Sequence, residues 1–257
     1  MKLDLTPSRL LLVPFAVLSM AAVGHAELAT DLIKKGDNYA QKLQTAEALS
    51  CYLPAEKLQP QNGKLLAHIA REYRHLMSDA SSKEDKLRLG GIAVNYSFRA
   101  AAASPSDAEA QLAPAISLGK VLPYQGSKEQ FEASKMIKEC AERSIKLDPS
   151  NDLAWHVLGR WHEILADVSL VKRTFAPLVY GKVPTSTNEE AVECFEKAIK
   201  LNPNRLMHYV ELGKTYAQMG RTTDAKRCIN KGLGMTCTEK DDPETKSKGK
   251  EVLDKLK

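Results

Sequence analysis

The sequence predicts an all-α solenoid of about five antiparallel helix pairs. Two observations support this fold class. Amphipathic segments with helical spacing end shortly before a proline at similar intervals along the chain, and no segment alternates apolar and polar residues as a half-buried strand does. Proline stops a helix because it lacks the amide hydrogen and clashes with the preceding turn. The prolines that follow these segments are Pro60, Pro105, Pro149 and Pro203.

An upstream helix precedes each of these segments and carries a small residue near its middle. A small residue there lets the partner helix approach closely, and a ring three positions later lies on the same face and fills the space beside it. Helix pairs of this design, with about 34 residues each, are tetratricopeptide repeats. The small residues are Gly36, Ala70, Gly119, Gly159 and Gly213, and all except Gly119 have a ring at the third position after them.

We expect these repeats to form one domain at residues 27–257. The spacing of the markers predicts an insertion of about 20 residues in the fourth pair and shorter insertions in the second and third. A highly charged helix at 243–257 would cap the last apolar face. The predicted pairs are 29–62, 63–106, 107–150, 151–204 and 205–238. Capping boxes, in which a Ser or Thr is followed three residues later by Glu or Gln, are expected at Ser81, Ser106, Ser127 and Thr187.

The first 26 residues resemble a targeting segment. Lys2 and Arg9 precede an apolar run at 10–23, and Gly24-His25-Ala26 places small residues where a signal peptidase cleaves. The run is shorter than the ~20 residues that a membrane-spanning helix needs. We therefore expect a signal peptide and export to the periplasm or the exterior. A membrane anchor or a mitochondrial targeting segment is the alternative, and in either case only this segment would contact a membrane.

The composition limits the classes of partner. The net charge of +5 is mild for 257 residues, and no basic run is interleaved with aromatic residues, so nucleic acid is not an expected partner. The five cysteines are odd in number and include no C-x-x-C pair, which indicates neither a zinc cage nor a disulfide framework. They are expected to be small buried helix residues, although a bridge between Cys228 and Cys237 is conceivable in an exported chain.

The pattern becomes more specific between residues 151 and 216. One helix ends in Leu158-Gly159-Arg160-Trp161, an insertion follows at 165–183, and the next helix has the markers Pro184, Ser186, Thr187, Ala191, Lys197, Ala198, Leu201 and Pro203. This arrangement resembles the regulator of microtubule dynamics family. The resemblance implies a tetratricopeptide scaffold that binds proteins and is not an enzyme. It also implies microtubules as a partner, but only for a chain that stays in the cytosol.

A row of charged residues predicts where a partner would bind. In tetratricopeptide repeats the first helix of each pair lines the concave face, and the residue after the small one points into the groove. A row of cations inside a concavity favours an acidic partner segment and makes binding sensitive to salt. The positions are Asp37, Arg71, Lys120, Arg160 and Lys214, of which all except Asp37 are basic. Arg74 and His75 lie one turn past Arg71.

A second hypothesis places a small-ligand site or an enzyme at the insertion. Trp161, His162, Lys172 and Arg173 would then recognise a phosphate or a lipid headgroup. Trp155 is expected in the core, whereas Trp161 lies off the main apolar stripe. His162-Glu163 begins like a zinc-protease helix, but Ala166 stands where the second histidine belongs. The sequence therefore predicts no catalytic residue, metal or cofactor.

Overall fold

The computed structural model describes the backbone of residues 15–167 and 185–256, and side chains from Ala26 onward. This part of the chain is helical and contains no strand, which confirms the predicted all-α solenoid. The helices are α1 (Phe15–Gln41), α2 (Thr45–Leu58), α3 (Gly63–Asp79), α4 (Lys83–Ala103), α5 (Ala108–Val121), α6 (Ser127–Leu147), α7 (Asp152–Ala166), α9 (Asn188–Leu201), α10 (Leu206–Gln218), α11 (Thr222–Leu233) and α12 (Asp242–Lys255).

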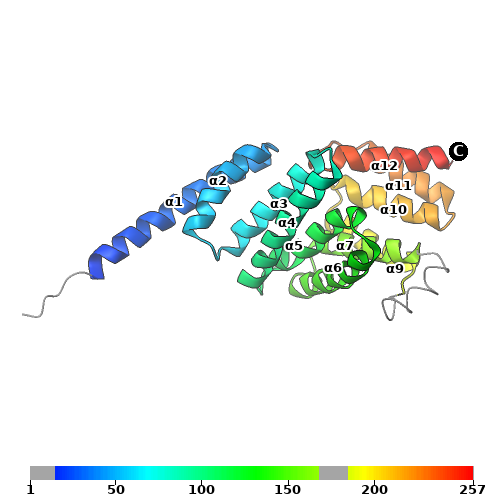
Figure 1. Cartoon of the computed structure of the whole chain (residues 1–257). Helices are drawn as coiled ribbons and strands as arrows, with labels where there is room; N and C mark the ends of the chain where they lie inside the picture. The colour runs from blue at the N-terminus through cyan, green and yellow to red at the C-terminus, as the bar shows by residue number, and fades with distance from the viewer. Residues whose placement is uncertain (1–14, 168–184, 257) are drawn as a thin grey trace, which may run out of the picture.

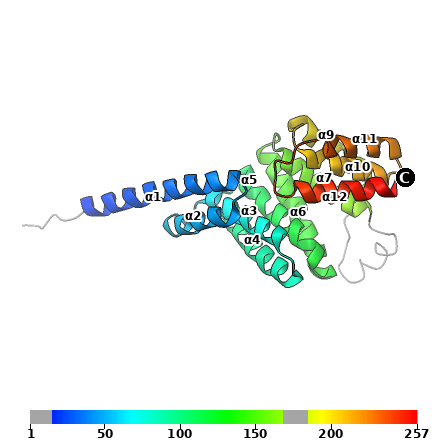
Figure 2. The same ribbon diagram turned by 90° about the horizontal axis from the view of Figure 1, so that it is seen from above.

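The helices stack roughly in chain order, as Figures 1 and 2 show, with the first part of α1 extending away from the rest. Each first helix packs on the second helix of its own pair, and the first helices α3, α5, α7 and α10 also contact one another in sequence. Helix α12 lies against α10 and α11. Consecutive pairs therefore share one continuous wall, which is the wall that carries the predicted groove.

Three of the predicted small residues lie at close helix contacts. A Cβ atom on Gly36 would lie 2.4 Å from Tyr52 Cε1, one on Gly159 would lie 3.0 Å from Phe195 Cε1, and one on Gly213 would lie 2.5 Å from Ile229 Cγ1. At these positions the second helix leaves no room for a side chain. Gly119 differs, because a Cβ there would have nothing within 4 Å. The close-approach rule is therefore wrong for the third pair.

Of the two tryptophans, Trp161 is more deeply buried than Trp155, which is the reverse of what the sequence predicted. Trp161 is only 5% exposed in the core cluster between α6 and α7, and its indole Nε1 donates to the carbonyl oxygen of Ser134 at 2.9 Å. Trp155 is half-buried at the edge, where its Nε1 donates to the carbonyl oxygen of Pro149. Trp161 follows Leu158 by three positions and so shares its inward face. Trp161 is therefore the buried core residue, and Trp155, expected in the core, packs against the same cluster while only partly buried.

One predicted capping box is confirmed, and at the other three helix starts the N-cap lies one residue from the predicted position. Thr187 Oγ1 accepts from the backbone N of Glu190 at 3.2 Å, and the Glu190 carboxylate accepts from the backbone N of Thr187 at 2.9 Å. Elsewhere the N-caps are Ser82, Asp107 and Gly126, each one residue from the predicted position. Ser82 and Asp107 satisfy a free amide with their own side chains, which is what an N-cap requires.

Two further expectations concern the cysteines and the first helix. Cys228 is buried, Cys237 is exposed, and both are free thiols, so the conceivable bridge between them is not formed. Helix α1 runs without a break through Ala26, the predicted cleavage position. Among the described residues, no helix has both the length and the apolar character needed to cross a membrane.

Candidate partner-binding surface

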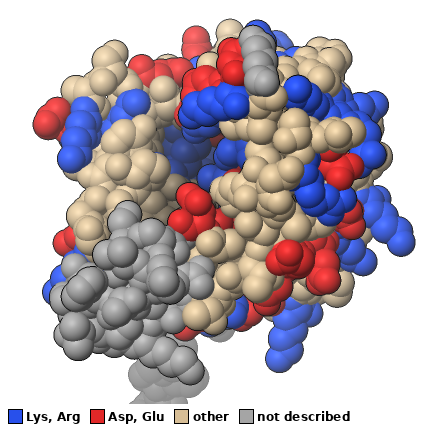
Figure 3. All heavy atoms as spheres, turned by 90° about the vertical axis from the view of Figure 1, so that its right-hand side faces the viewer, with Lys and Arg blue, Asp and Glu red and all other residues tan. Residues whose placement is uncertain are grey.

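The predicted groove cations lie on the wall formed by α3, α5, α7 and α10, which we call the inner surface. Arg74 Nη1 on α3 donates to Ser117 Oγ on α5 at 3.0 Å, and Arg160 on α7 donates to Glu211 on α10, so the wall is linked by polar contacts. Seen with the right-hand side of Figure 1 facing the viewer, the molecule shows a hollow with Lys and Arg side chains inside it (Figure 3). The side chains of Lys120 and Arg160 are 25% and 33% exposed, so an approaching partner can reach them.

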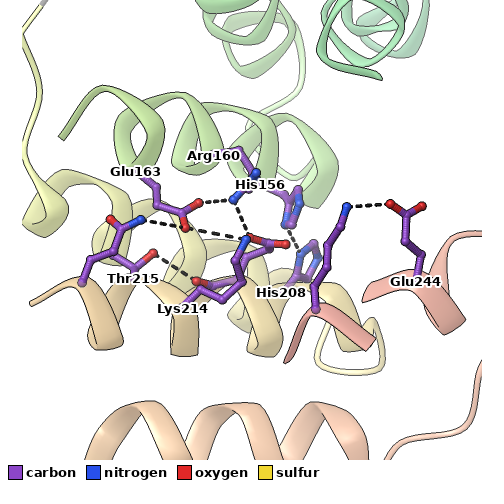
Figure 4. Close-up of polar contacts among 10 residues, drawn as sticks. His156, Arg160, Glu163, His208, Lys214, Thr215 and Glu244 are labelled. Atoms are coloured by element: carbon purple, nitrogen blue, oxygen red, sulfur yellow. Dashed lines mark hydrogen bonds and ion pairs between the residues drawn. The ribbon is translucent and has the colours of Figure 1, made fainter. Parts of the chain in front are cut away.

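A cluster of four charges joins α7 to α10 (Figure 4). Arg160 Nη1 is paired with Glu163 and donates to Glu211 Oε2 at 2.6 Å, while Lys214 Nζ donates to the same Glu211 atom at 2.6 Å. Lys214 Nζ also lies 3.8 Å from Glu163 Oε1. Two cations and two carboxylates thus cancel, and the field of this part of the inner surface is weaker than the cations alone predict.

The two carboxylates of this cluster differ in their titration. Burial raises the pKa of Glu163, and Arg160 and Lys214 offset this effect only in part. Burial acts on Glu211 in the same direction, but Arg160 and Lys214 outweigh it and lower the pKa of Glu211. Glu211 accepts from both cations at short distance, so its carboxylate is the acceptor that joins Arg160 and Lys214 in this cluster.

A histidine pair extends the α7–α10 contact. His208 Nε2 lies 2.8 Å from Asp152 Oδ2, and the Nδ1 atoms of His208 and His156 are 3.0 Å apart. One of these two Nδ1 atoms donates its hydrogen to the other. Burial lowers the pKa of His156 well below 6.5, helped by the positive charges nearby. His156 is therefore neutral in the folded chain at neutral pH.

At the other end of the wall, α3 carries its own carboxylate. Glu72 is fully buried, and its Oε1 accepts from Arg71 Nε at 3.0 Å while its Oε2 faces His75 Nδ1 at 3.3 Å. Burial raises the pKa of Glu72, but the contacts with His75 and Arg71 outweigh burial and lower it. Asp37 accepts from the hydroxyl of Tyr52 at 2.7 Å, within the first helix pair. Glu72, which sequence reasoning missed, thus binds two of the residues predicted for the groove, Arg71 and His75.

Lys120 meets a segment from the far end of the chain. Its Nζ donates to Asp241 Oδ1 at 2.7 Å and to Ser78 Oγ at 2.8 Å, and Ser78 Oγ donates to Asp241 Oδ1 at 3.0 Å. Asp241 belongs to residues 235–241, which connect α11 to α12 and which we call the C-terminal clasp. Two more ion pairs hold the clasp, from Lys240 Nζ to Asp79 at 2.9 Å and from Arg205 Nε to Glu239 at 2.7 Å.

Of the residues proposed for an insertion site, only Trp161 and His162 lie in the described part of the chain, and their rings pack edge to face with centroids 5.1 Å apart. Trp161 belongs to the core, and His162 is buried, with Nδ1 bonded to Ser186 Oγ beside the start of α9. Lys172 and Arg173 lie outside the described residues. Among the residues that are described, no three of His, Cys, Asp and Glu are placed to hold a metal ion.

Sequence reasoning located the cations and missed most of their partners. Glu211 stands three positions before Lys214, and this helical spacing is a signal that would have found it. Glu72 is adjacent to Arg71 and gives no periodic signal. Asp241 is 121 positions from Lys120, so only the folded chain brings the two together.

Known proteins share the sequence pattern and the fold of this chain. The family model described as regulator of microtubule dynamics protein 1-3 matches residues 32–257. The mouse regulator of microtubule dynamics protein 1 is 28% identical over 241 residues, covering 93% of this chain and 79% of the mouse protein. The Pongo abelii protein of the same name is 30% identical over 207 residues, covering 80% and 66%. A thermophilic TPR protein of Thermus thermophilus shares the fold, with a TM-score of 0.61 at 15% identity over 88% of this chain and 98% of that structure.

Proposed function

Because the chain belongs to the regulator of microtubule dynamics family, we propose that it is a non-catalytic adaptor that binds a segment of a partner protein on its inner surface. The observation that carries this proposal is the placement of Arg71, Lys120, Arg160 and Lys214 on the contacting first helices of four pairs. All four are partly exposed, with Lys214 the most buried at 18%. A wall of this kind binds an extended or helical segment laid along it.

The charges of the inner surface favour an acidic segment as the ligand. Each cation is already bonded to a carboxylate of the chain, so the wall is arranged to hold carboxylates rather than to repel them. At a partly exposed cation such as Lys120, a partner carboxylate can replace the chain's own carboxylate, so the cation stays paired. The affinity is expected to fall as salt rises, because exposed charges are screened within about 8 Å at physiological ionic strength.

A random peptide-display library panned over the full chain tests this proposal. We expect peptides rich in Asp and Glu to be enriched, and the enrichment to disappear with Lys120→Gln combined with Lys214→Gln. The matched control is Lys200→Gln combined with Lys231→Gln, which removes the same charge from exposed positions on the second helices α9 and α11. Acidic peptides that bind the inner-surface variant as well as the control variant would contradict the proposal, provided both variants keep their helical circular dichroism.

The location of the adaptor is a separate proposal that rests on residues 2–26. Their basic-then-apolar pattern supports export with cleavage after Ala26. N-terminal sequencing of the native protein is expected to begin at Glu27, and a chain that retains residues 2–26 would contradict export.

If the chain stays in the cytosol, microtubules are the alternative partner. The relatives are regulators of microtubule dynamics by name, and a cytosolic chain would meet microtubules. Sedimentation of the full chain with purified microtubules tests this alternative. Pelleting that is lost in the Lys120→Gln and Lys214→Gln variant would support it, and a chain that stays in the supernatant would contradict it.

A further inference from the structure

The C-terminal clasp brings an acidic segment of the chain onto the inner surface. Figure 1 shows the start of α12 beside the ends of α3 and α4, far from both in sequence. The bond from Ser78 to Asp241 spans 163 positions. The clasp thus has the form of the ligand proposed above, an acidic peptide that crosses from one repeat to another.

The receptor for Asp241 has the features of a carboxylate-binding site. One hydroxyl and one ammonium group donate to the same oxygen, Asp241 Oδ1, from Ser78 at 3.0 Å and from Lys120 at 2.7 Å. The Ser78 hydroxyl is also 3.1 Å from the backbone carbonyl oxygen of Arg74, one turn earlier on α3, and the Arg74 guanidinium donates to Ser117 Oγ on α5. Hydrogen bonds from charged donors are the strong ones for a carboxylate. None of these donors requires the backbone of the clasp, so a carboxylate from another chain can satisfy them.

Two carboxylates of the clasp are more exposed than the other carboxylates of the wall. The side chain of Asp241 is 41% exposed and that of Glu239 is also 41% exposed, whereas Glu163 and Glu211 are 2% and 10% exposed. Exposed ion pairs contribute little to stability. A competing segment can therefore exchange with Asp241 at the solvent-exposed edge, but it cannot reach the carboxylates of the α7–α10 cluster.

We propose that Ser78 and Lys120 form a binding site for a carboxylate of an acidic partner segment, and that Asp241 occupies this site as an intramolecular ligand until the partner displaces it. This inference rests on the proposed function, because it names the first contact of the same inner surface and adds a device that regulates it. The apparent affinity of the partner is lowered by the fraction of molecules in which the clasp is closed.

Because the clasp belongs to the same chain as the site, it is tethered beside it, and this tether determines which partner segments can displace it. A ligand held by a short linker acts at an effective concentration of about a millimolar. A segment with a single carboxylate therefore competes poorly. A segment with several acidic residues gains further contacts along the wall with Arg71 and Arg160, and it displaces the clasp at lower concentration.

Fluorescence anisotropy with a labelled peptide of residues 238–244 tests the site on the full chain. This peptide, TEKDDPE, carries the chemistry of the clasp in trans. Asp241→Asn in the full chain is expected to tighten peptide binding about three- to tenfold, because the competing carboxylate is gone. The matched control is Glu251→Gln, which removes the same charge from an exposed position on α12 and is expected to leave affinity unchanged. Equal affinity for wild type and Asp241→Asn would overturn the clasp while leaving the adaptor proposal in place.

A charge exchange separates the receptor from its ligand. Lys120→Asp is expected to abolish peptide binding and to speed amide hydrogen exchange in residues 235–241. Adding Asp241→Lys should restore slow exchange, because the ion pair is rebuilt with reversed polarity, but it should not restore binding of the acidic peptide. Peptide binding that survives Lys120→Asp would overturn the site. If exchange shows the clasp released in Asp241→Asn and no acidic peptide binds even then, the proposed acidic partner fails together with the site.

Discussion

Helices α5 and α10 carry the same dipeptide on the inner surface and use it differently. In α10, Gly213 lies against Ile229 and Lys214 donates to Glu211 of its own helix. In α5, Gly119 has open space beside it and Lys120 donates to Asp241, which comes from 121 positions away. The position of the dipeptide on its helix decides which side the lysine faces. The neighbouring helices and the distant clasp decide which partner it meets.

Removing the central carboxylate on the α10 side should have the largest effect. Glu211→Gln is expected to lower the free energy of unfolding by about 3 kcal/mol, because Arg160 and Lys214 lose the charge between them while they remain largely buried. Urea unfolding followed by circular dichroism measures this change. A loss no greater than that of Glu251→Gln, whose exposed side chain should cost almost nothing, would show that the cluster is not a stabilising centre.

Adding one methyl group to each glycine compares the packing of the two helices directly. Gly213→Ala is expected to cost about 1–2 kcal/mol, because overpacking against Ile229 and the backbone of Ala225 outweighs the gain in helix propensity. Gly119→Ala is expected to stabilise the chain by about 0.5–1 kcal/mol, because only the propensity gain remains. Thermal unfolding of both variants gives the two signs, and equal signs would remove the contrast between α5 and α10.

Acid should loosen the α10 side through His156. Its pKa is below the unfolded value of about 6.5, so the unfolded chain binds more protons, and stability is complete above that pH and falls as the pH drops toward the folded pKa. Burial also lowers the pKa of His68 and of His162, which act in the same direction. Comparison with His156→Gln isolates one histidine, whose contribution to the slope is up to about 1.4 kcal/mol per pH unit. Urea unfolding at several pH values below neutrality measures it, and identical slopes would refute the assignment.

Removing the carboxylate on the α5 side should have the smallest effect on stability. Asp241→Asn is expected to cost less than about 1 kcal/mol, since Asp241 is 41% exposed and the pair is screened by solvent. The loss should shrink further at high salt, because the remaining contribution is electrostatic. Thermal unfolding at low and high salt measures both values. A salt-independent loss as large as that of Glu211→Gln would mean that the clasp is a structural core element.

The sequence could predict features that depend on helical spacing, and it failed where distant segments meet. The small-residue rule placed Gly36, Gly159 and Gly213 at helix contacts because each fits a periodic pattern within its own pair. The rule failed at Gly119, which is exposed and has no neighbour within 4 Å of a Cβ, so it does not lie at the contact between α5 and α6. The inner-surface cations were found by the same periodicity, whereas Asp241 has no periodic relation to Lys120 and could not be assigned. Trp155 and Trp161 were exchanged because the pattern gave the helix but not its exact rotation against α6.

Gly249 on α12 shows how closely this helix packs on the last helix pair. A Cβ there would lie 3.1 Å from Ile229 Cγ2 and 3.2 Å from Val210 Cγ1, so α12 sits as closely on the last pair as a neighbouring repeat would. Stacked repeats grow by covering the apolar face left by the pair before them. Because α12 already covers the face of α10 and α11, a sixth pair has nowhere to stack in this direction. Helix α12 thus takes the position on the last pair that a following repeat would otherwise occupy, and Gly249 is one of its points of close approach.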